Sequence, residues 1–216
     1  MISKLAIKQG LNKKIFEPLL HSRMRKKYAD SPISFISSNC MGGVLSHDLG
    51  MQFCSPTVNL WMSASDYIKL IENMDYYFSQ TFENGNQGED YPIGRLGDLK
   101  LHCIHYHTFE EAKEKWDART MRINKNRIIL TFTDQNNCNK ELLERFSNVD
   151  YPKIFLTSNA EYAKYDFSVY MNSVKYMEKH NGRTLVDDAF IFRGFSGKRN
   201  FEHYFNIDQF LINNHF

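Results

Sequence analysis

The stretch from Ser31 to Gly43 constrains the fold most strongly, because it runs from an apolar segment through small polar residues into two glycines. Ser34–Ile36 is short and β-prone, which is typical of a buried strand. Residues 37–40 are small, and Val44–Leu49 has the pattern of a helix start. α/β sheets build ligand sites at such turns, since glycine lets backbone N–H groups approach an anion. The sequence therefore predicts an α/β fold with a site at this turn.

Strand and helix patterns alternate along the rest of the chain. Further strands are predicted at Thr57–Met62, Asp98–His107, Arg127–Phe132, Lys153–Leu156, Phe167–Met171 and Ala189–Arg193. Helices are predicted within Leu5–Lys27, Tyr67–Phe78, Phe109–Ile123, Lys140–Phe146 and Phe205–Ile212. A long loop rich in Gly, Asn and acidic residues is predicted over Asn84–Gly97, with a turn at Tyr91–Gly94.

This alternation favours parallel strands covered by helices. We therefore predict an α/β fold with a three-layer Rossmann-like core and a mostly parallel sheet. The chain of 216 residues suits a single α/β domain, residues 1–216. Within that domain we expect a helical lead-in over 1–30, the parallel core over 31–160, and a less regular C-terminal part over 161–216.

Composition and charge exclude several classes of protein. Apolar residues make up 42% of the chain, enough for a sizeable core, and a net charge of +2 offers no broad basic face for nucleic acid. The basic cluster Arg23–Lys27 predicts at most a weak peripheral contact with anionic lipid. No apolar run approaches membrane-spanning length and no signal core begins the chain, so we expect a cytoplasmic protein without a transmembrane segment. The 4 cysteines are scattered and are expected to be reduced.

The carboxyl ends of the predicted strands gather polar side chains from distant parts of the chain. Ligands bind beyond these ends in parallel sheets. The predicted ligand-binding residues, with those of the first turn and helix, are Ser38, Asn39, Gly42, Gly43, His47, Asp48, Asp66, His107, Asp134 and Ser158. A structural alternative exists for several of them, since Asp66, Asp134 and Ser158 are also typical helix caps.

Cys40 and His105 are the candidates for catalysis at this edge. Cys40 stands before a predicted helix, whose N-terminus stabilises a thiolate, so it is a candidate nucleophile or oxyanion-site residue. His105 ends a predicted strand and is the candidate general base. Backbone N–H groups near Gly42 and Gly43 are expected to bind an oxyanion or a phosphate. The alternatives are an inert buried thiol and a core histidine with satisfied hydrogen bonds.

A metal site is the other chemistry that the histidines allow. His102, His105 and His107 lie close in sequence, but on a strand only the last two share a face. Two ligands would need help from His47 or Asp48, so we predict no metal. The chain also lacks a phosphate-loop consensus, a Gly-x-Gly-x-x-Gly and a Gly-x-Ser-x-Gly, which argues against common NTPases, dehydrogenases and α/β hydrolases.

Several longer motifs occur together between Ile33 and Asp134. They are Ile-Ser-Ser-Asn-Cys-Met-Gly-Gly, His-Asp-Leu-Gly, Ser-Pro-Thr-Val-Asn-Leu, Asp-Tyr-Ile-Lys, Tyr-Pro-Ile-Gly-Arg-Leu-Gly-Asp and His-Tyr-His-Thr-Phe-Glu-Glu-Ala-Lys-Glu-Lys-Trp. In these motifs the chain resembles an uncharacterised bacterial family associated with exopolysaccharide and capsule gene clusters, whose members are sometimes labelled acetyltransferases. The chain departs from that family at Met41, where the family has an aromatic residue.

The resemblance implies a cytosolic role in surface-polysaccharide biosynthesis. We therefore expect a transferase that modifies a sugar or polysaccharide precursor by acyl transfer, with acetyl-CoA as donor and no covalently bound cofactor. One alternative is a glycosyltransferase-like enzyme that uses a nucleotide sugar, but it would need an acidic metal-binding pair and no Asp-x-Asp occurs. The other alternative is a non-catalytic binding module of a polysaccharide-assembly complex.

Overall fold

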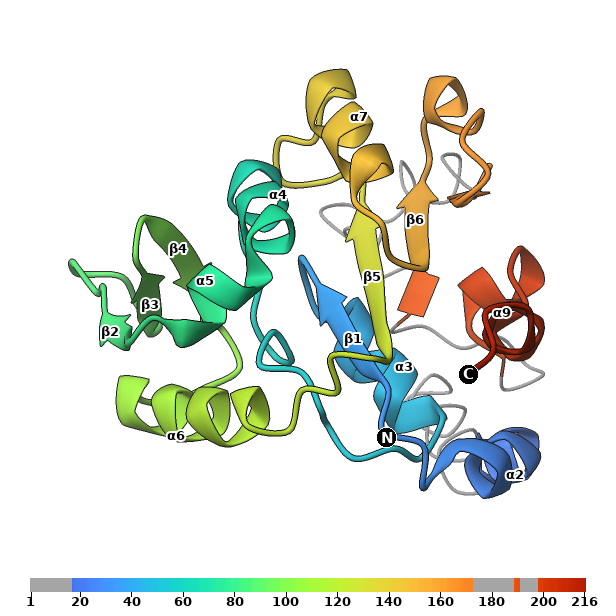
Figure 1. Cartoon of the computed structure of the whole chain (residues 1–216), viewed down its shortest axis with the longest axis horizontal. Coiled ribbons are helices and arrows are strands. Elements are labelled where there is room, and N and C mark those ends of the chain that lie inside the picture. Colours follow the sequence, from blue (N-terminus) through green and yellow to red (C-terminus); the bar gives the residue numbers. More distant parts are fainter. Residues whose placement is uncertain (1–16, 173–188, 191–197) are drawn as a thin grey trace, which may run out of the picture.

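A computed structural model describes residues 17–172, 189–190 and 198–216 and contains a four-stranded parallel sheet (Figure 1). Its strands, in spatial order, are β1 (Ser34–Ser37), β5 (Ile128–Thr133), β6 (Lys153–Thr157) and β7 (Ser168–Tyr170). Each neighbouring pair is parallel. The predicted α/β fold with a parallel sheet is therefore confirmed.

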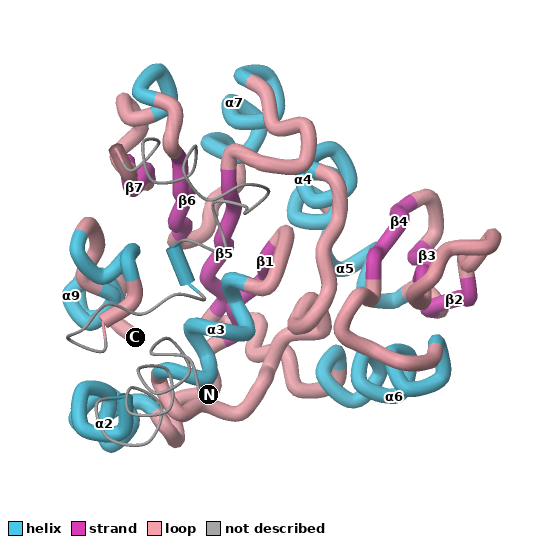
Figure 2. Tube along the Cα trace, turned by 180° about the vertical axis from the view of Figure 1, so that it is seen from behind, coloured by secondary structure: helices cyan, strands magenta, loops and turns pink. Residues whose placement is uncertain are grey.

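Helices cover both faces of this sheet, because successive strand residues point to opposite sides. Phe35 lies on the face covered by α2 (Glu17–Tyr28), α3 (Met41–Asp48) and α9 (Ile207–Asn213). Ile36 lies on the other face, covered by α4 (Ala64–Glu72) and α7 (Lys140–Asn148). Both views show α3 beside β1 (Figure 1 and Figure 2). The two apolar clusters give the three layers.

A second, antiparallel sheet corrects the prediction for the middle of the chain. It consists of β2 (Phe82–Asn84), β3 (Ile93–Leu96) and β4 (Leu99–His102), next to α5 (Met74–Ser79) and α6 (Phe109–Thr120). The strand predicted over Asp98–His107 is therefore wrong as a member of the parallel sheet. The turn predicted at Tyr91–Gly94 is also wrong, since Gly94 lies within β3, where a Cβ would be 2.0 Å from the Phe82 ring.

Thr57–Met62 is not a strand either, although most of it is buried. Asn59 has a φ of 67°, in the left-handed region, which interrupts an extended backbone. The carbonyl of Val58 accepts hydrogen bonds from side chains instead of a neighbouring strand. Trp61 forms an isolated antiparallel bridge with His102. This segment therefore links the two sheets and belongs to neither.

The helix predicted over Tyr67–Phe78 is divided, because Asn73 adopts a φ of −138° and ends α4 before α5 begins. The remaining short helices are η2 (Ala160–Tyr162) and η4 (Asn200–His203). The predicted lead-in helix corresponds to α2 from Glu17 onward. The strand predicted over Ala189–Arg193 lies outside the described residues, except for Ala189 and Phe190, which are buried.

Glycine at position 42 lets α3 lie close against β1. A Cβ there would be 2.9 Å from the carbonyl oxygen of Phe35 and 3.1 Å from the Cβ of Ser37. At Gly43 the nearest atom is a methyl carbon of Val58, 3.1 Å away, which belongs to a movable side chain. Gly42 therefore sets the distance between the first turn of α3 and the end of β1.

We predict that Gly42→Ala lowers the free energy of unfolding by about 1–3 kcal/mol, because the added methyl group overpacks against the β1 backbone. Gly43→Ala is the matched control. Its gain in helix propensity, up to about 1 kcal/mol, offsets the contact with Val58, so we expect little net change. Urea unfolding of both variants measures the difference. Equal losses in the two variants would contradict this role for Gly42.

Candidate functional site

The turn between β1 and α3 is held firmly at the carboxyl edge of the parallel sheet. The carbonyl of Ser38 accepts from the N–H of Met62 at 3.0 Å. Asn39 is buried; its Nδ2 donates to Oγ1 of Thr133 at 3.0 Å, and its Oδ1 accepts from the N–H of Met41 at 3.1 Å. The predicted ligand residues Ser38 and Asn39 thus fix the turn, and Asn39 also caps the first N–H of α3.

Cys40 and His105 meet at this edge. The Sγ of Cys40 lies 3.2 Å from Nε2 of His105. Cys40 is half-buried directly before α3, and its side chain does not cap that helix. His105 is exposed and belongs to a turn after β4, in which the N–H of Tyr106 donates to the carbonyl of Cys103 at 3.0 Å. The structure therefore brings the two residues together, although His105 does not end a parallel strand.

A thiol and an imidazole at this distance can exchange a proton. The imidazole takes the proton from the thiol and leaves a thiolate, which is the nucleophilic form of cysteine. Cys40 is followed by the first turn of α3, which includes the N–H groups of Gly42 and Gly43. Glycine has no side chain, so Gly42 and Gly43 can contribute only their backbone groups to a site. N–H groups at a helix start favour negative charge on a nearby oxygen or sulfur.

Trp61 and His102 stack against each other, and each lies on a chain segment next to one that carries Cys40 or His105. Their ring centroids are 3.7 Å apart, with an interplanar angle of 4°. The hydroxyl of Tyr91 lies 3.0 Å from Nδ1 of His102, and burial lowers the pKa of His102. Trp61 directly precedes Met62, and His102 lies at the end of β4, just before the His105 turn. Sequence reasoning missed Trp61, since its apolar surroundings were interpreted as a strand.

Asp134 and Ser158 lie at the same edge, where they bond to each other. The Oδ2 of Asp134 accepts from Oγ1 of Thr157 at 2.7 Å and from the N–H of Ser158 at 2.7 Å. It also accepts from the N–H of Asn159 at 3.3 Å. These bonds tie the end of β5 to the end of β6. That role is structural, but it is not helix capping, since Asn139 caps α7 and Asn159 caps η2.

Asp66 and His107 are placed at helix starts. The N–H of Asp66 donates to Oγ of Ser63 at 3.1 Å in the first turn of α4. The N–H of His107 donates to Oε2 of Glu111 at 3.1 Å, just before α6. The backbone of each residue is therefore used in helix capping, but the capping side chain of α4 is that of Ser63 and not that of Asp66.

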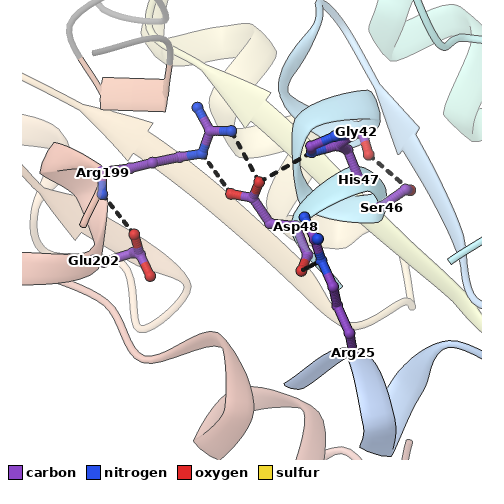
Figure 3. Close-up of polar contacts among 7 residues, drawn as sticks. All are labelled: Arg25, Gly42, Ser46, His47, Asp48, Arg199 and Glu202. Carbon is purple, nitrogen blue, oxygen red and sulfur yellow. Dashed lines mark hydrogen bonds and ion pairs between the residues drawn. The ribbon is translucent and has the colours of Figure 1, made fainter. Parts of the chain in front are cut away.

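The structure does not bring His47 and Asp48 to the thiol–imidazole pair, because they end α3 whereas Cys40 precedes it. Figure 3 shows Asp48 held by the fork of Arg199, whose Nη2 donates to Oδ1 at 2.9 Å and whose Nε donates to Oδ2. Nδ1 of His47 lies 3.3 Å from the same carboxylate, and Nε of Arg25 donates to the Asp48 carbonyl at 3.3 Å. Asp48 therefore joins α3 to α2 and to the C-terminal segment.

No group of three or more His, Cys, Asp or Glu side chains within the described ranges is arranged to hold a metal ion. His102 contacts Trp61 and Tyr91, and His105 contacts Cys40, so two of the three histidines considered as a metal site have other partners. In the same part of the chain, no helix is long and apolar enough to cross a bilayer.

The fold and the site define a three-layer α/β protein with a thiol–imidazole pair at the carboxyl edge of its parallel sheet. The chain belongs to the family described as a domain of unknown function, DUF1919, which matches residues 11–211. It is similar to an uncharacterized protein of Haemophilus influenzae, with 30% identity over 198 residues that cover 92% of this chain and 93% of that protein. Membership of an uncharacterised family is thus confirmed, without a link to capsule or exopolysaccharide.

We predict that Asp48→Ala lowers the free energy of unfolding by about 3–5 kcal/mol, because it leaves the Arg199 guanidinium buried without its counter-charge. Asp48 and Arg199 are 5% and 8% exposed. The matched control is Lys69→Ala, which breaks an exposed 2.6 Å pair with Asp98 and should cost less than about 1 kcal/mol. Chemical denaturation measures both; equal costs would contradict a structural role for the buried pair.

We also predict that Cys40 reacts with iodoacetamide faster than the other cysteines near neutral pH. Burial raises the pKa of Cys103 and that of Cys138 to about 12, and it raises the pKa of Cys54. Those thiols therefore stay protonated, whereas Cys40 is accessible beside an imidazole. Mass spectrometry of each cysteine gives the rates. If Cys40 labels no faster than Cys103, its thiol is structural.

Proposed function

We propose that this protein is an acyltransferase in which Cys40 is the nucleophile and His105 the general base. The observation that supports this most directly is the 3.2 Å distance between Sγ of Cys40 and Nε2 of His105, which is hydrogen-bond reach for a nucleophile and its base. The half-buried thiol and the exposed imidazole leave the pair open to a substrate. Asn39 holds the turn that presents the thiol.

The proposed reaction has two steps, acylation of Cys40 and transfer of the acyl group to the acceptor. His105 takes the proton of the Cys40 thiol, and the thiolate attacks the carbonyl carbon of an acyl thioester. The bond from that carbon to the donor sulfur breaks, and the donor leaves as a thiol with the proton from the imidazolium. An acceptor hydroxyl then gives its proton to His105 and attacks acyl-Cys40, which forms the ester and restores the thiol. The N–H groups of Gly42 and Gly43 stabilise each oxyanion.

Acetyl-CoA is the proposed donor, and a hydroxyl of a sugar or polysaccharide precursor is the proposed acceptor. The resemblance of the Cys40 and His105 motifs to capsule-associated proteins supports this acceptor class. The half-buried Trp61 on the segment beside the pair also supports it, since an aromatic ring packs against the apolar face of a sugar. The scheme needs no covalently bound cofactor.

We place the proposed reaction in the cytoplasm and propose a weak attraction to anionic lipid. The basic cluster Arg23–Lys27 lies on α2. Lys27 pairs with Asp208 at 2.7 Å, and Arg25 donates to the backbone at Asp48. Part of the positive charge is thus engaged within the protein, which limits the attraction to a lipid surface.

Incubation with acetyl-CoA should leave an acetyl group on Cys40, which mass spectrometry of the denatured protein detects. Cys40→Ala should carry none. His105→Gln should acetylate about 100- to 10,000-fold more slowly, because it lacks the general base. Cys138→Ser is the matched control, since its thiol is one that burial keeps protonated, and it should acetylate at the wild-type rate.

Acetylation at an unchanged rate in His105→Gln, or away from Cys40, would contradict the proposal. A thermal shift with nucleotide sugars but none with acetyl-CoA would favour the glycosyltransferase-like alternative. Binding of a polysaccharide precursor without any transfer would favour the binding module.

A further inference from the structure

We infer that Arg119 is a positioning residue that keeps the imidazole of His105 within hydrogen-bond distance of the Cys40 thiol. Arg119 lies in α6 and touches neither side chain of the pair; it acts through Tyr106 and Val58. The inference rests on the proposed roles of Cys40 and His105, because a positioning residue needs a reactive pair to align.

The Arg119 guanidinium forms a buried hydrogen-bonded cluster, the Arg119 knot, with Tyr106 and Val58. Its Nη1 donates to the hydroxyl oxygen of Tyr106 at 2.6 Å and to the carbonyl of Val58 at 3.0 Å. The Tyr106 hydroxyl donates to the same carbonyl at 3.1 Å. The guanidinium also lies over the ring of Phe53, 5.4 Å from its centroid. Burial raises the pKa of Tyr106, so its hydroxyl keeps the proton that it donates.

The knot is an unusual place for a positive charge. Arg119 is only 6% exposed. Over residues 17–172, 189–190 and 198–216 it forms no ion pair with a carboxylate, and its hydrogen-bond acceptors are a carbonyl and a hydroxyl. A buried charge without a counter-charge is costly, and an apolar side chain would fill the same space more cheaply. Arginine at this position therefore fits a role in holding Val58 and Tyr106 in place.

The knot adjoins the two chain segments that carry the reactive pair. Tyr106 directly follows His105, so fixing the Tyr106 hydroxyl fixes the turn that carries the imidazole. Val58 lies against the first turn of α3, where a Cβ on Gly43 would be 3.1 Å from its methyl carbon. One guanidinium thus joins the turn of His105 to the helix start that follows Cys40.

Proton transfer between Cys40 and His105 tolerates only a small change in the distance between them. The Cys40–His105 distance is 3.2 Å, and a misplacement of about 1 Å at a reacting centre can cost about 100-fold in rate. His105 itself is exposed, so packing around its own side chain does little to hold the imidazole. Arg119 adds a restraint on the turn from its buried side, through the Tyr106 hydroxyl.

The test measures the rate and the pH midpoint of Cys40 alkylation by iodoacetamide in the full chain, without any substrate. Arg119→Met should slow labelling at neutral pH by at least about 10-fold and move the midpoint towards the value of a free thiol, about 8.5. Arg119→Lys keeps a donor and should recover part of the effect. Tyr106→Phe keeps the ring and removes one hydroxyl, and should slow labelling in the same direction.

Leu143→Ala is the matched control, because it removes buried volume from α7, away from the knot. It should lower the melting temperature without moving the pH midpoint. Circular dichroism establishes which variants are folded, and if Arg119→Met is unfolded, Tyr106→Phe decides the question.

A wild-type pH profile in folded Arg119→Met, or in Tyr106→Phe when the former is unfolded, overturns the inference. A midpoint shift in Leu143→Ala as large as that in the knot variants also overturns it, since the effect would then be general destabilisation. His105→Gln separates this failure from failure of the proposed function. If His105→Gln labels like the wild type, the pair itself has no role; if it alone is slow, the pair stands and only Arg119 is wrong.

Discussion

The close contact between α3 and β1 at Gly42 is the constraint on which the site depends. Any side chain at this position would meet the backbone of Phe35, so the helix could not lie at its present distance. Asn39 uses that closeness, since its amide reaches from the strand end to Thr133 while its oxygen caps the helix. At the far end, the pair of Asp48 and Arg199 anchors the same helix to the C-terminal segment (Figure 3). A helix fixed at both ends presents Cys40 in one place.

The parallel sheet could be predicted because its central strands are mainly apolar and buried, as at Ile128–Thr133, which is buried throughout. The antiparallel sheet could not. Phe82–Asn84 is too short to show a period, and Gly94 looked like a turn residue because the ring that covers it, Phe82, is distant in sequence. At Thr57–Met62 the apolar pattern is correct but the backbone is not extended, since tertiary hydrogen bonds to Val58 replace a neighbouring strand.

The residues of the candidate site could be predicted from the sequence, but the structural element that carries His105 could not. Cys40 was found from the turn that contains it, whereas His105 was chosen as the end of a parallel strand that does not exist. Its contact with Cys40 depends on how two sheets meet, and no local pattern encodes that. A signal for Arg119 was present: it shares the buried stripe of α6 with Ala112 and Trp116 at helical spacing. Its charge concealed it, because arginine on a helix is usually assigned to the solvent side.

The thiol and the imidazole stand on different sheets, Cys40 after a strand of the parallel one and His105 after a strand of the antiparallel one. The 3.2 Å distance between Sγ of Cys40 and Nε2 of His105 therefore depends on how the two sheets are placed relative to each other. A substitution that shifts the small sheet against the parallel sheet would change that distance, and with it the reactivity of the thiol, without touching either residue.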